Sequence, residues 1–402
     1  MEELIFILCC RSLVDAISAR NNSIRSQDRR NGLITVRNTA NTTGRSIFRR
    51  WRAWRRIRRF TRPKTAHLNL ALQGGGAHGA FTWGVLDRLL EEEWLVLDGL
   101  SGTSAGAMNA VVLASGWLNG GRVGAKTALH GYWRAVSNTA RMGPLQAGPL
   151  EYLIHGWNRD WSPAYIMLSA LTKMASPYQL NPTGFNPLRR LLESHVDFER
   201  LRNNKRIKLF IAATNVQSGM LKLFRTHELS VDAVLASACL PLLFHAIRIE
   251  EAHYWDGGYT ANPPLLPLMR ECRSRDLLLV QLEPLWRGRV PTRLQEIVDR
   301  SNEIAFNANL LNELQVLAAL EGPPGCFPIR RSRLGLLPVR YRLHHLETEG
   351  VIEGMGRTSR INADWSFLLH LRDLGRQQAD AWLEAHKGDI GRRSTMTLNR
   401  YL

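Results

Sequence analysis

Short apolar runs and helical patterns alternate through the central part of the chain. Residues 67–73 form an apolar run that is typical of a buried strand, and three glycines follow it. Apolar positions then recur with helical spacing between residues 81 and 90, and residues 95–100 form a second apolar run. A helix rich in small residues is predicted to begin just after residue 104. Because strand, glycine turn and helix follow one another twice, the pattern predicts a parallel sheet covered by helices.

The same pattern resumes in the second half of the chain. Residues 207–213 and 277–282 are predicted strands, and residues 294–320 and 363–387 are predicted helices that pack outside the sheet. We therefore predict a three-layer α/β/α fold with a mainly parallel central sheet. Residues 140–200 are rich in Gly, Pro, Trp and Tyr, which indicates a cap-like insertion beside a site.

Charge separates an N-terminal arm from the rest of the chain. The 402 residues carry a formal net charge of +18, and residues 1–64 contain 16 Lys and Arg against 4 Asp and Glu. Two thirds of the net charge therefore belongs to this arm. We predict a disordered, basic arm over residues 1–64, a folded domain over residues 65–390 and a tail over residues 391–402.

The arm ends in an arginine-rich amphipathic segment that runs from Arg45 to Phe60. From Trp51 onward its apolar residues are spaced three apart, which gives a narrow apolar stripe on a helix otherwise covered with arginine. This composition suits a helix at the surface of an anionic membrane, and a solvated basic tail fits the same residues. Nucleic-acid binding is disfavoured, because no folded nucleic-acid reader accompanies the segment.

Cysteine content and hydropathy bound the location of the protein. The five cysteines include no CxxC pair, so a zinc site is disfavoured and a reducing compartment is indicated. No run approaches the ~20 apolar residues of a membrane-spanning helix. A short apolar run begins at Leu4, but Glu2 and Glu3 precede it where a secretory signal has positive charge. We expect a cytoplasmic protein and leave peripheral attachment to a membrane open.

One serine is a candidate nucleophile. The run Gly102-Thr103-Ser104-Ala105-Gly106 matches the G-x-S-x-G pattern, in which the glycines relieve crowding around a sharp strand-to-helix turn. Such a turn lifts the serine hydroxyl out of the sheet edge and places it at the N-terminus of a helix. A serine N-cap after a tight turn fits the same five residues.

A glycine-rich turn precedes this serine in the sequence Gly74-Gly75-Gly76-Ala77-His78-Gly79. Consecutive glycines leave their backbone N–H groups free to face an anion, as an oxyanion hole requires. The glycines at 74, 76 and 79 also match the G-x-G-x-x-G spacing of a dinucleotide site, and acidic residues between 91 and 98 lie near the required distance. A nucleotide P-loop is excluded, since no Lys-Ser/Thr pair follows the last glycine.

An aspartate followed by two glycines, Asp256-Gly257-Gly258, stands late in the chain. Two glycines after an aspartate allow a turn that presents the carboxylate to a site. An Asp-Gly hairpin turn fits the same residues, so this feature alone does not identify a catalytic group.

In this order, the glycine-rich turn, the G-x-S-x-G serine and the late D-G-G resemble the patatin-like phospholipase family, in its bacterial form, over about residues 66–390. Two further blocks are similar to that family. They are Ala236-Ser237-Ala238-Cys239-Leu240-Pro241 and Asn262-Pro263-Pro264.

The resemblance implies a Ser–Asp dyad that needs no metal and no cofactor. Ser104 would attack an ester carbonyl, and Asp256 would accept its proton and later activate water. The implied oxyanion hole consists of Gly74, Gly75, Gly76 and Ala105. The glycines that support these motifs are Gly79, Gly102, Gly106, Gly257 and Gly258.

One histidine lies within the glycine-rich turn, and three others follow later in the chain. His78 occupies a position where many members of the family have Arg or Lys, so it is a candidate for a weaker, pH-dependent positive charge beside the oxyanion loop. A histidine satisfied by solvent or by the backbone is an equal alternative. The spacing of His227, His245 and His253 does not favour a third catalytic member among them.

The resemblance implies a lipid acyl hydrolase of the phospholipase A or lysophospholipase type, which releases fatty acid from phospholipid at an anionic membrane surface. One alternative is the same dyad acting on a neutral lipid, a thioester or a storage polyester. A second alternative is a non-catalytic membrane-binding module whose arm is its main activity. A nucleotide-dependent oxidoreductase is the least favoured, because it leaves the G-x-S-x-G and D-G-G runs unexplained.

Overall fold

The computed structural model describes residues 65–141, 163–321, 341–348, 355 and 357–401. The predicted arm and residues 142–162 of the predicted insertion lie outside these residues. The strands are β1 (Ala66–Leu72), β2 (Leu95–Gly102), β3 (Lys208–Asn215), β4 (Leu221–Arg225), β5 (Ile247–Ile249), β6 (Ala252–Asp256), β7 (Asp276–Gln281) and β8 (Arg342–Glu347). The α-helices are α3 (Gly79–Leu89), α4 (Ala105–Ala140), α6 (Pro163–Met174), α7 (Pro177–Leu180), α8 (Pro187–His195), α9 (Phe198–Arg202), α10 (Val231–Ser237), α11 (Leu266–Glu271), α12 (Leu294–Glu321) and α13 (Trp365–His386). Short 3-10 helices are η1 (Gly76–His78), η2 (Thr226–Glu228), η3 (Gly257–Tyr259), η4 (Arg357–Ile361) and η5 (Leu398–Tyr401).

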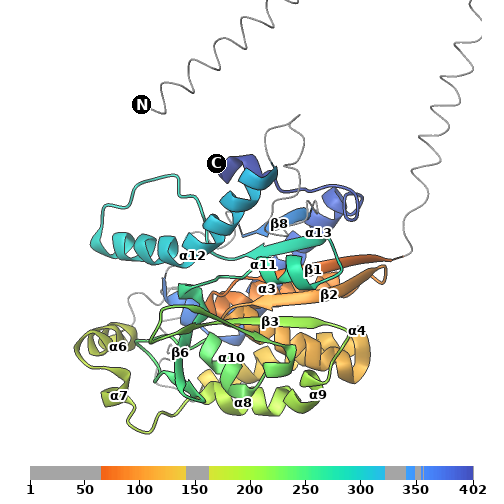
Figure 1. The fold of residues 1–402 in the computed structure, drawn as a ribbon. Coiled ribbons are helices and arrows are strands. Elements are labelled where there is room, and N and C mark those ends of the chain that lie inside the picture. The colour runs from red at the N-terminus through yellow and green to blue at the C-terminus, as the bar shows by residue number, and fades with distance from the viewer. Residues whose placement is uncertain (1–64, 142–162, 322–340, 349–354, 356, 402) are drawn as a thin grey trace, which may run out of the picture. The chain divides into compact units, whose positions relative to one another are not determined.

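A single mixed sheet forms the centre of the folded part. Its strand order is β5-β6-β3-β2-β1-β7-β8, and β4 pairs with β3 outside this path. In this order, the five strands β3, β2, β1, β7 and β8 are parallel to one another. The strands β4, β5 and β6 are antiparallel to their partners. The predicted parallel sheet is therefore confirmed, with an antiparallel extension at one end (Figure 1).

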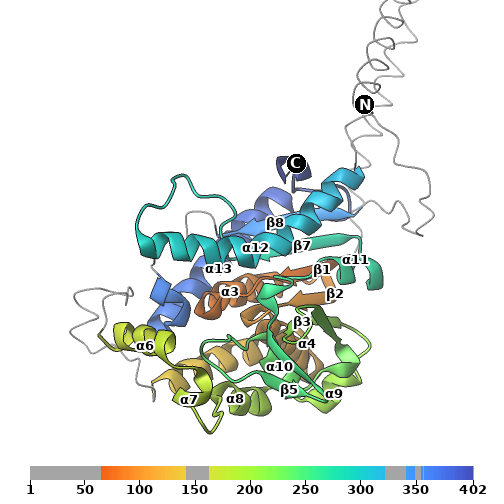
Figure 2. The same ribbon diagram turned by 60° about the vertical axis from the view of Figure 1, so that its left-hand side comes forward.

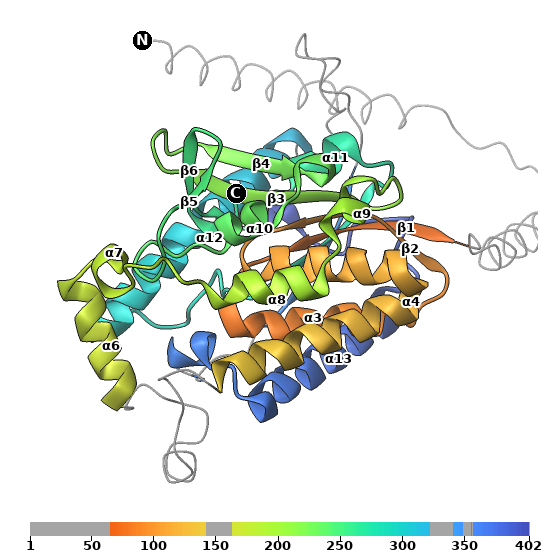
Figure 3. The same cartoon turned by 90° about the horizontal axis from the view of Figure 1, so that it is seen from below.

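Alternation along the strands gives the sheet two apolar faces. In β1, Leu70 and Leu72 belong to one core cluster, whereas Ala71, whose side chain points the opposite way, belongs to a second. The larger cluster joins this face to α3, α4, α10 and α13, and the smaller one joins the opposite face to α11 and α12. Helices thus cover both faces of the sheet, which confirms the predicted three layers (Figures 2 and 3).

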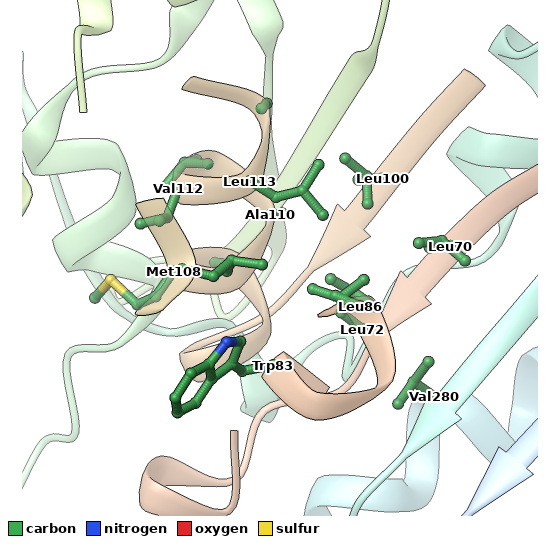
Figure 4. Close-up of a cluster of buried hydrophobic side chains, with 14 of the residues drawn as sticks. Leu70, Leu72, Trp83, Leu86, Leu100, Met108, Ala110, Val112, Leu113 and Val280 are labelled. Carbon is green, nitrogen blue, oxygen red and sulfur yellow. The ribbon is translucent and has the colours of Figure 1, made fainter. Parts of the chain in front are cut away.

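The larger core sits between the central strands and the two helices that follow them. Leu100 of β2, Leu86 of α3 and Leu113 of α4 are fully buried there, together with Trp83 at one end of the cluster (Figure 4). These residues come from the strand–turn–helix units that the hydrophobic pattern predicts. The same core therefore fixes the two glycine-containing turns between strands and helices.

Two glycines break the long helix α4. Gly120 and Gly121 have non-helical dihedral angles, and the φ of Gly121 is 58° with ψ at −139°. Only glycine adopts such a combination without a steric cost from Cβ. The helix therefore consists of two pieces, of which the first begins directly after Ser104.

Part of the predicted insertion and of the predicted tail packs into the main body. Leu191 and Leu192 of α8 are buried in the larger core. Near the C-terminus, Met396 and Leu398 are buried in the smaller core, so residues 391–401 are not separate from the domain. None of the helices in the described residues is long and apolar enough to cross a membrane.

We expect Leu100→Ala to lower the free energy of unfolding by about 2–5 kcal/mol, because it removes a fully buried side chain and leaves a cavity in the larger core. Val123→Ala is the matched control, since Val123 is 75% exposed, and it should change stability by less than about 0.5 kcal/mol. Urea unfolding of both variants measures the difference, and equal small effects would contradict the placement of Leu100.

Candidate active site

Three strands, β2, β4 and β6, pair with β3, and their register along β3 decides which residues come together. Ile211 of β3 pairs with Gly102 of β2 and also with Phe224 of β4, so β2 and β4 lie on opposite edges of β3. Two residues further along, Ala213 pairs with Asp256 of β6 and also with β4. Because β4 occupies one edge of β3 throughout, β2 and β6 lie on the other edge, one after the other. The end of β6 therefore meets the end of β2.

This arrangement places Ser104 on a sharp turn. The chain leaves β2 at Gly102 and enters α4 at Ala105, and Ser104 between them has φ 54° and ψ −121°. A positive φ is uncommon for a residue with a side chain and marks local strain. A Cβ on Gly106 would lie 2.1 Å from the carbonyl oxygen of Leu72, so the turn requires glycine there.

Asp256 ends β6 and is buried beside this turn, with 1% of its surface exposed. Its Oδ1 accepts a hydrogen bond of 2.7 Å from the Gly258 N–H, while Oδ2 is buried without a partner in the described residues. Burial raises the pKa of Asp256 to about 7, against the smaller opposing effects of the Gly258 N–H and the Ser104 hydroxyl. The carboxylate is therefore close to half-protonated at neutral pH.

The Ser104 hydroxyl and Asp256 are close without a hydrogen bond of normal length. The hydroxyl stabilises the carboxylate enough to lower its pKa, yet neither carboxylate oxygen accepts a hydrogen bond from it. The two groups are therefore near enough to interact electrostatically, but they are not hydrogen-bonded to each other. Catalytic hydrogen bonds in unliganded enzymes are often long and shorten when substrate binds.

One segment holds the backbone of both residues. The Oγ of Ser237, at the end of α10, accepts a hydrogen bond of 3.0 Å from the Ser104 N–H. Two residues on, the carbonyl oxygen of Cys239 accepts a hydrogen bond of 2.8 Å from the Asp256 N–H. Both residues belong to the 236–241 block that resembles the family, but the sequence assigns no role to either. Their role depends on contacts with distant parts of the chain.

The glycine-rich turn packs directly against Ser104. A Cβ on Gly74 would lie 2.9 Å from the Cβ of Ser104, so no larger residue fits there. The Gly74 N–H donates a hydrogen bond of 2.8 Å to Asn262 Oδ1 and is not available to an anion. Gly74 is therefore removed from the predicted oxyanion hole. In the described structure the N–H groups of Gly75 and Gly76 donate no hydrogen bond.

A buried glutamine ties this turn to its surroundings. The Nε2 of Gln73 donates to Asn307 Oδ1 at 2.8 Å and to the Asn262 carbonyl oxygen at 3.2 Å. Its Oε1 accepts from the N–H groups of Leu282 and Glu283, both at 2.7 Å. The sequence pattern does not reveal this role of Gln73. Its one signal for such a role is that a polar residue ends an apolar strand run, just before the glycines.

His78 is a neutral, buried side chain. Its Nε2 lies 2.8 Å from Ser359 Oγ. Burial, and to a smaller extent the positive charge of Arg360, lowers the pKa of His78 to about 3. His78 is therefore uncharged at neutral pH and does not supply the positive charge considered from the sequence. The charge beside this turn belongs to Arg360, whose carbonyl oxygen would lie 2.3 Å from a Cβ on Gly76.

The contacts around Ser104 and Asp256 do not support the dinucleotide site or the third catalytic histidine considered from the sequence. Glu92 forms ion pairs with Arg88 and Lys387, and Asp98 accepts hydrogen bonds from the backbone before β7, so neither faces the glycine-rich turn. His245 stacks on Tyr178, and neither it nor the other two candidate histidines bonds to Ser104 or Asp256. Among the described residues, no group of three or more His, Cys, Asp or Glu is arranged to hold a metal ion.

The fold and this site define an α/β domain in which a strained serine between strand and helix faces a buried carboxylate and a glycine-rich turn. Residues 70–269 match the model of the patatin-like phospholipase family. The chain therefore belongs to the patatin-like phospholipase family. A comparison with curated protein sequences gives no match.

Solved structures of two bacterial proteins are among those to which the chain is similar. VipD from Legionella pneumophila is 17% identical, with 81% of this chain and 67% of that chain covered and a TM-score of 0.40. The type III effector ExoU is 18% identical, with 81% of this chain and 54% of that chain covered and a TM-score of 0.29. The ExoU–SpcU complex from Pseudomonas aeruginosa gives 20% identity, coverage of 66% and 56%, and a TM-score of 0.27.

We expect Asp256→Asn to stabilise the folded protein at pH 8 and to leave its stability almost unchanged at pH 4. The folded pKa of about 7 lies above the unfolded value of ~3.9, so the wild type loses stability as pH rises from about 4 to about 7. The amide carries no charge and escapes this loss, which amounts to at most about 4 kcal/mol. Urea unfolding at the two pH values measures the effect.

The control for this prediction is Glu251→Gln, which changes a carboxylate whose side chain is 95% exposed. It should shift the free energy of unfolding by less than about 0.5 kcal/mol at both pH values. A gain for Asp256→Asn that is equal at pH 4 and pH 8 would show that charge burial is not its cause.

Proposed function

We propose that the chain is a serine acyl-ester hydrolase that releases fatty acid from phospholipids, with Ser104 as nucleophile and Asp256 as base. The observation that carries this proposal is the unpartnered, buried Oδ2 of Asp256 beside the strained Ser104 turn. A buried acceptor without a partner is costly in a folded protein. Its lone pair suits the proton that Ser104 must lose in order to attack.

In the first half of the proposed reaction, Ser104 Oγ attacks the ester carbonyl while Asp256 takes its proton. The negative charge then forms on the former carbonyl oxygen. The N–H groups of Gly75, Gly76 and Ala105 are the proposed donors to that oxygen, and Ala105 stands at the start of α4 where the helix dipole adds to them. Collapse of this intermediate releases the alcohol part of the lipid, which takes the proton from Asp256.

In the second half, Asp256 deprotonates a water molecule that attacks the acyl group on Ser104. The fatty acid leaves, and the proton returns from Asp256 to the Ser104 oxygen. A single carboxylate can do both steps because its pKa of about 7 is far better matched to neutral pH than that of an exposed aspartate. The proposed roles of Gly79, Gly102, Gly257 and Gly258 are close packing around this centre.

Because His78 is neutral and buried, it supplies no positive charge in the proposed mechanism, and Asp256 alone accepts the proton from Ser104. The arm remains a proposed attachment to anionic membranes, since residues 1–64 lie outside the described residues. The alternatives named from the sequence, another ester or a non-catalytic module, gain no specific support from the site. The phospholipid assignment itself is supported by the family and is tested by the following experiment.

We expect Ser104→Ala and Asp256→Asn each to reduce turnover by at least about 10³-fold on anionic phospholipid vesicles and on a soluble short-chain ester. The first variant removes the attacking oxygen, and the second removes the proton acceptor. Fatty-acid release by purified full-length protein measures the loss. Ser218→Ala, in the exposed β3–β4 turn, is the control and should retain wild-type turnover. Turnover by Ser104→Ala near that of the wild type would refute the nucleophile assignment.

The pH dependence tests the base separately. Because Asp256 must be deprotonated to accept the proton, kcat/KM for a soluble ester should rise with pH, reach half its maximum near pH 7 and level off above about pH 8. A soluble substrate avoids changes in vesicle charge over the same range. A rise centred near pH 4 would mean that the base is an ordinary, solvated carboxylate and not the buried Asp256.

A further inference from the structure

A basic and apolar segment leaves the sheet beside the candidate active site. Residues 284–294 connect β7 to α12 and have the sequence PLWRGRVPTRL, with three arginines and no acidic residue. Trp286, Val290 and Leu294 are 82%, 84% and 80% exposed, so the three largest apolar side chains of its outer part face solvent. Single exposed apolar residues are common on proteins, but three in one short segment among arginines are not explained by packing.

The segment is held in place by buried charges. Arg287 Nε donates a hydrogen bond of 3.0 Å to Glu303 Oε2, and the Glu303 side chain is only 3% exposed. Arg300 Nη2 donates a hydrogen bond of 2.9 Å to the Leu285 carbonyl oxygen. These contacts fix the inner part of the segment against α12. Its apolar side chains are therefore exposed on a fixed support.

The residues just before the segment adjoin the glycine-rich turn. A Cβ on Gly75 would lie 3.0 Å from Leu282 Cδ1, and the Glu283 N–H bonds to Gln73. Glu283 also pairs with Arg360, which contacts Gly76. The segment thus begins directly after two residues that contact the glycine-rich turn or the glutamine before it.

Apolar side chains are exposed on a second element at this side of the molecule. Ile166, Met167 and Leu171 of α6 are 52%, 63% and 40% exposed. In all three views α6 and α7 lie on the same side as the beginning of α12 (Figures 1, 2 and 3). The exposed apolar residues are therefore not confined to one loop but occur on two separate elements of the same side.

Charge decides which partner fits this side. Arg289 and Arg293 are exposed and form no ion pair with any described residue, so two cations are free beside the apolar side chains. Tryptophan and aliphatic residues next to unpaired arginines match the boundary of an anionic bilayer, where apolar groups enter the acyl region and guanidinium groups meet phosphates. A protein partner would instead need acidic groups placed to match both arginines.

We propose that residues 284–294 are a lipid-contact loop, which seats the folded domain on an anionic lipid surface with the Ser104 edge toward the lipid. This inference rests on the proposed lipid hydrolase function and names the surface from which that site takes its substrate. It is independent of the arm, because it assigns lipid contact to the folded domain itself.

The test uses full-length protein and vesicles of phosphatidylglycerol and phosphatidylcholine mixed 3:7. We expect Trp286→Ser/Leu294→Ser and Arg289→Gln/Arg293→Gln each to weaken vesicle binding by at least about tenfold, since each pair removes two contacts with the bilayer. Both double variants should cleave a soluble short-chain ester at the wild-type rate. Binding is measured by vesicle sedimentation, with fatty-acid release followed on the same samples.

Matched controls lie at the opposite end of the parallel strands, where β7 begins. Arg273 precedes β7 and Arg392 follows Gly391, whose N–H bonds to Asp276 at the start of β7, and both arginines are exposed. Arg273→Gln/Arg392→Gln removes the same charge as the arginine variant, and Val123→Ser replaces an exposed apolar residue away from the loop. Neither control should change vesicle binding by more than about twofold. A loss with the charge control equal to that of Arg289→Gln/Arg293→Gln would overturn the proposal, because net charge alone would then explain binding.

Amide hydrogen exchange separates the loop from the arm. Addition of the same vesicles should slow exchange in a peptide covering residues 284–294, and pure phosphatidylcholine vesicles should do so much less. Unchanged exchange in that peptide, or vesicle binding by the loop variants equal to that of the wild type, would overturn the proposal. If the wild type bound vesicles through the loop but cleaved neither substrate, the proposed hydrolase function would fail while the lipid contact stood.

Discussion

The candidate site depends on how one edge of β3 is divided between two strands. β2 occupies that edge as far as Ile211, and β6 occupies it from Ala213 onward in the opposite direction. Because a strand edge can pair with only one neighbour at a time, β2 cannot continue past Gly102. The chain must turn out of the sheet there, and the last residue of β6 faces the turn. Ser104 and Asp256 meet for this reason, although they are far apart in sequence.

Close backbone packing then sets what the site can contain. Gly74 and Gly106 approach Ser104 and Leu72 so closely that a methyl group has no room at either position. Hydrogen bonds from Ser104 to Ser237 and from Asp256 to Cys239 fix the two backbones from one segment. The strain at Ser104 is stabilised by its surroundings, as is usual for a functional residue in a rare conformation. The turn next to it keeps two glycine N–H groups free in the described structure.

Electrostatics around the site separate a neutral centre from a charged rim. Burial raises the pKa of Asp256 and lowers that of His78, so both changes favour the uncharged form. The charges of Arg287, Arg360 and their glutamate partners lie behind the glycine-rich turn. This division suits the proposed ester substrate, whose apolar chain would enter a site with little charge. The exposed Arg289 and Arg293 of the proposed lipid-contact loop would then meet anionic lipid at the surface.

Much of this could be predicted from the sequence because it is local. The strand runs, α3, α12 and α13 follow from hydrophobic periodicity, and their bounds in the structure differ from the prediction by at most two residues. For α4 the sequence predicts only the beginning after Ser104. Glycine spacing likewise marks the turn at Ser104, since Gly102 and Gly106 crowd each other within five consecutive residues. The close approach of Gly106 to Leu72 of β1 is a tertiary contact that the spacing does not show. The short strands β4, β5, β6 and β8 are not predicted, because so few residues leave only a weak alternation of apolar and polar positions, and their stability comes from pairing with the neighbouring strands.

By itself, the sequence determined the layer architecture, the nucleophile candidate and its aspartate, because each depends on residue types within a few positions of one another. Only the tertiary structure decided that Gly74 gives its N–H to Asn262, that His78 is neutral, and that Gln73 joins the turn to β7 and α12. The physical reason is the same in each case. A hydrogen-bond partner or the burial of a charge is set by residues that approach through space, and spacing along the chain does not specify them.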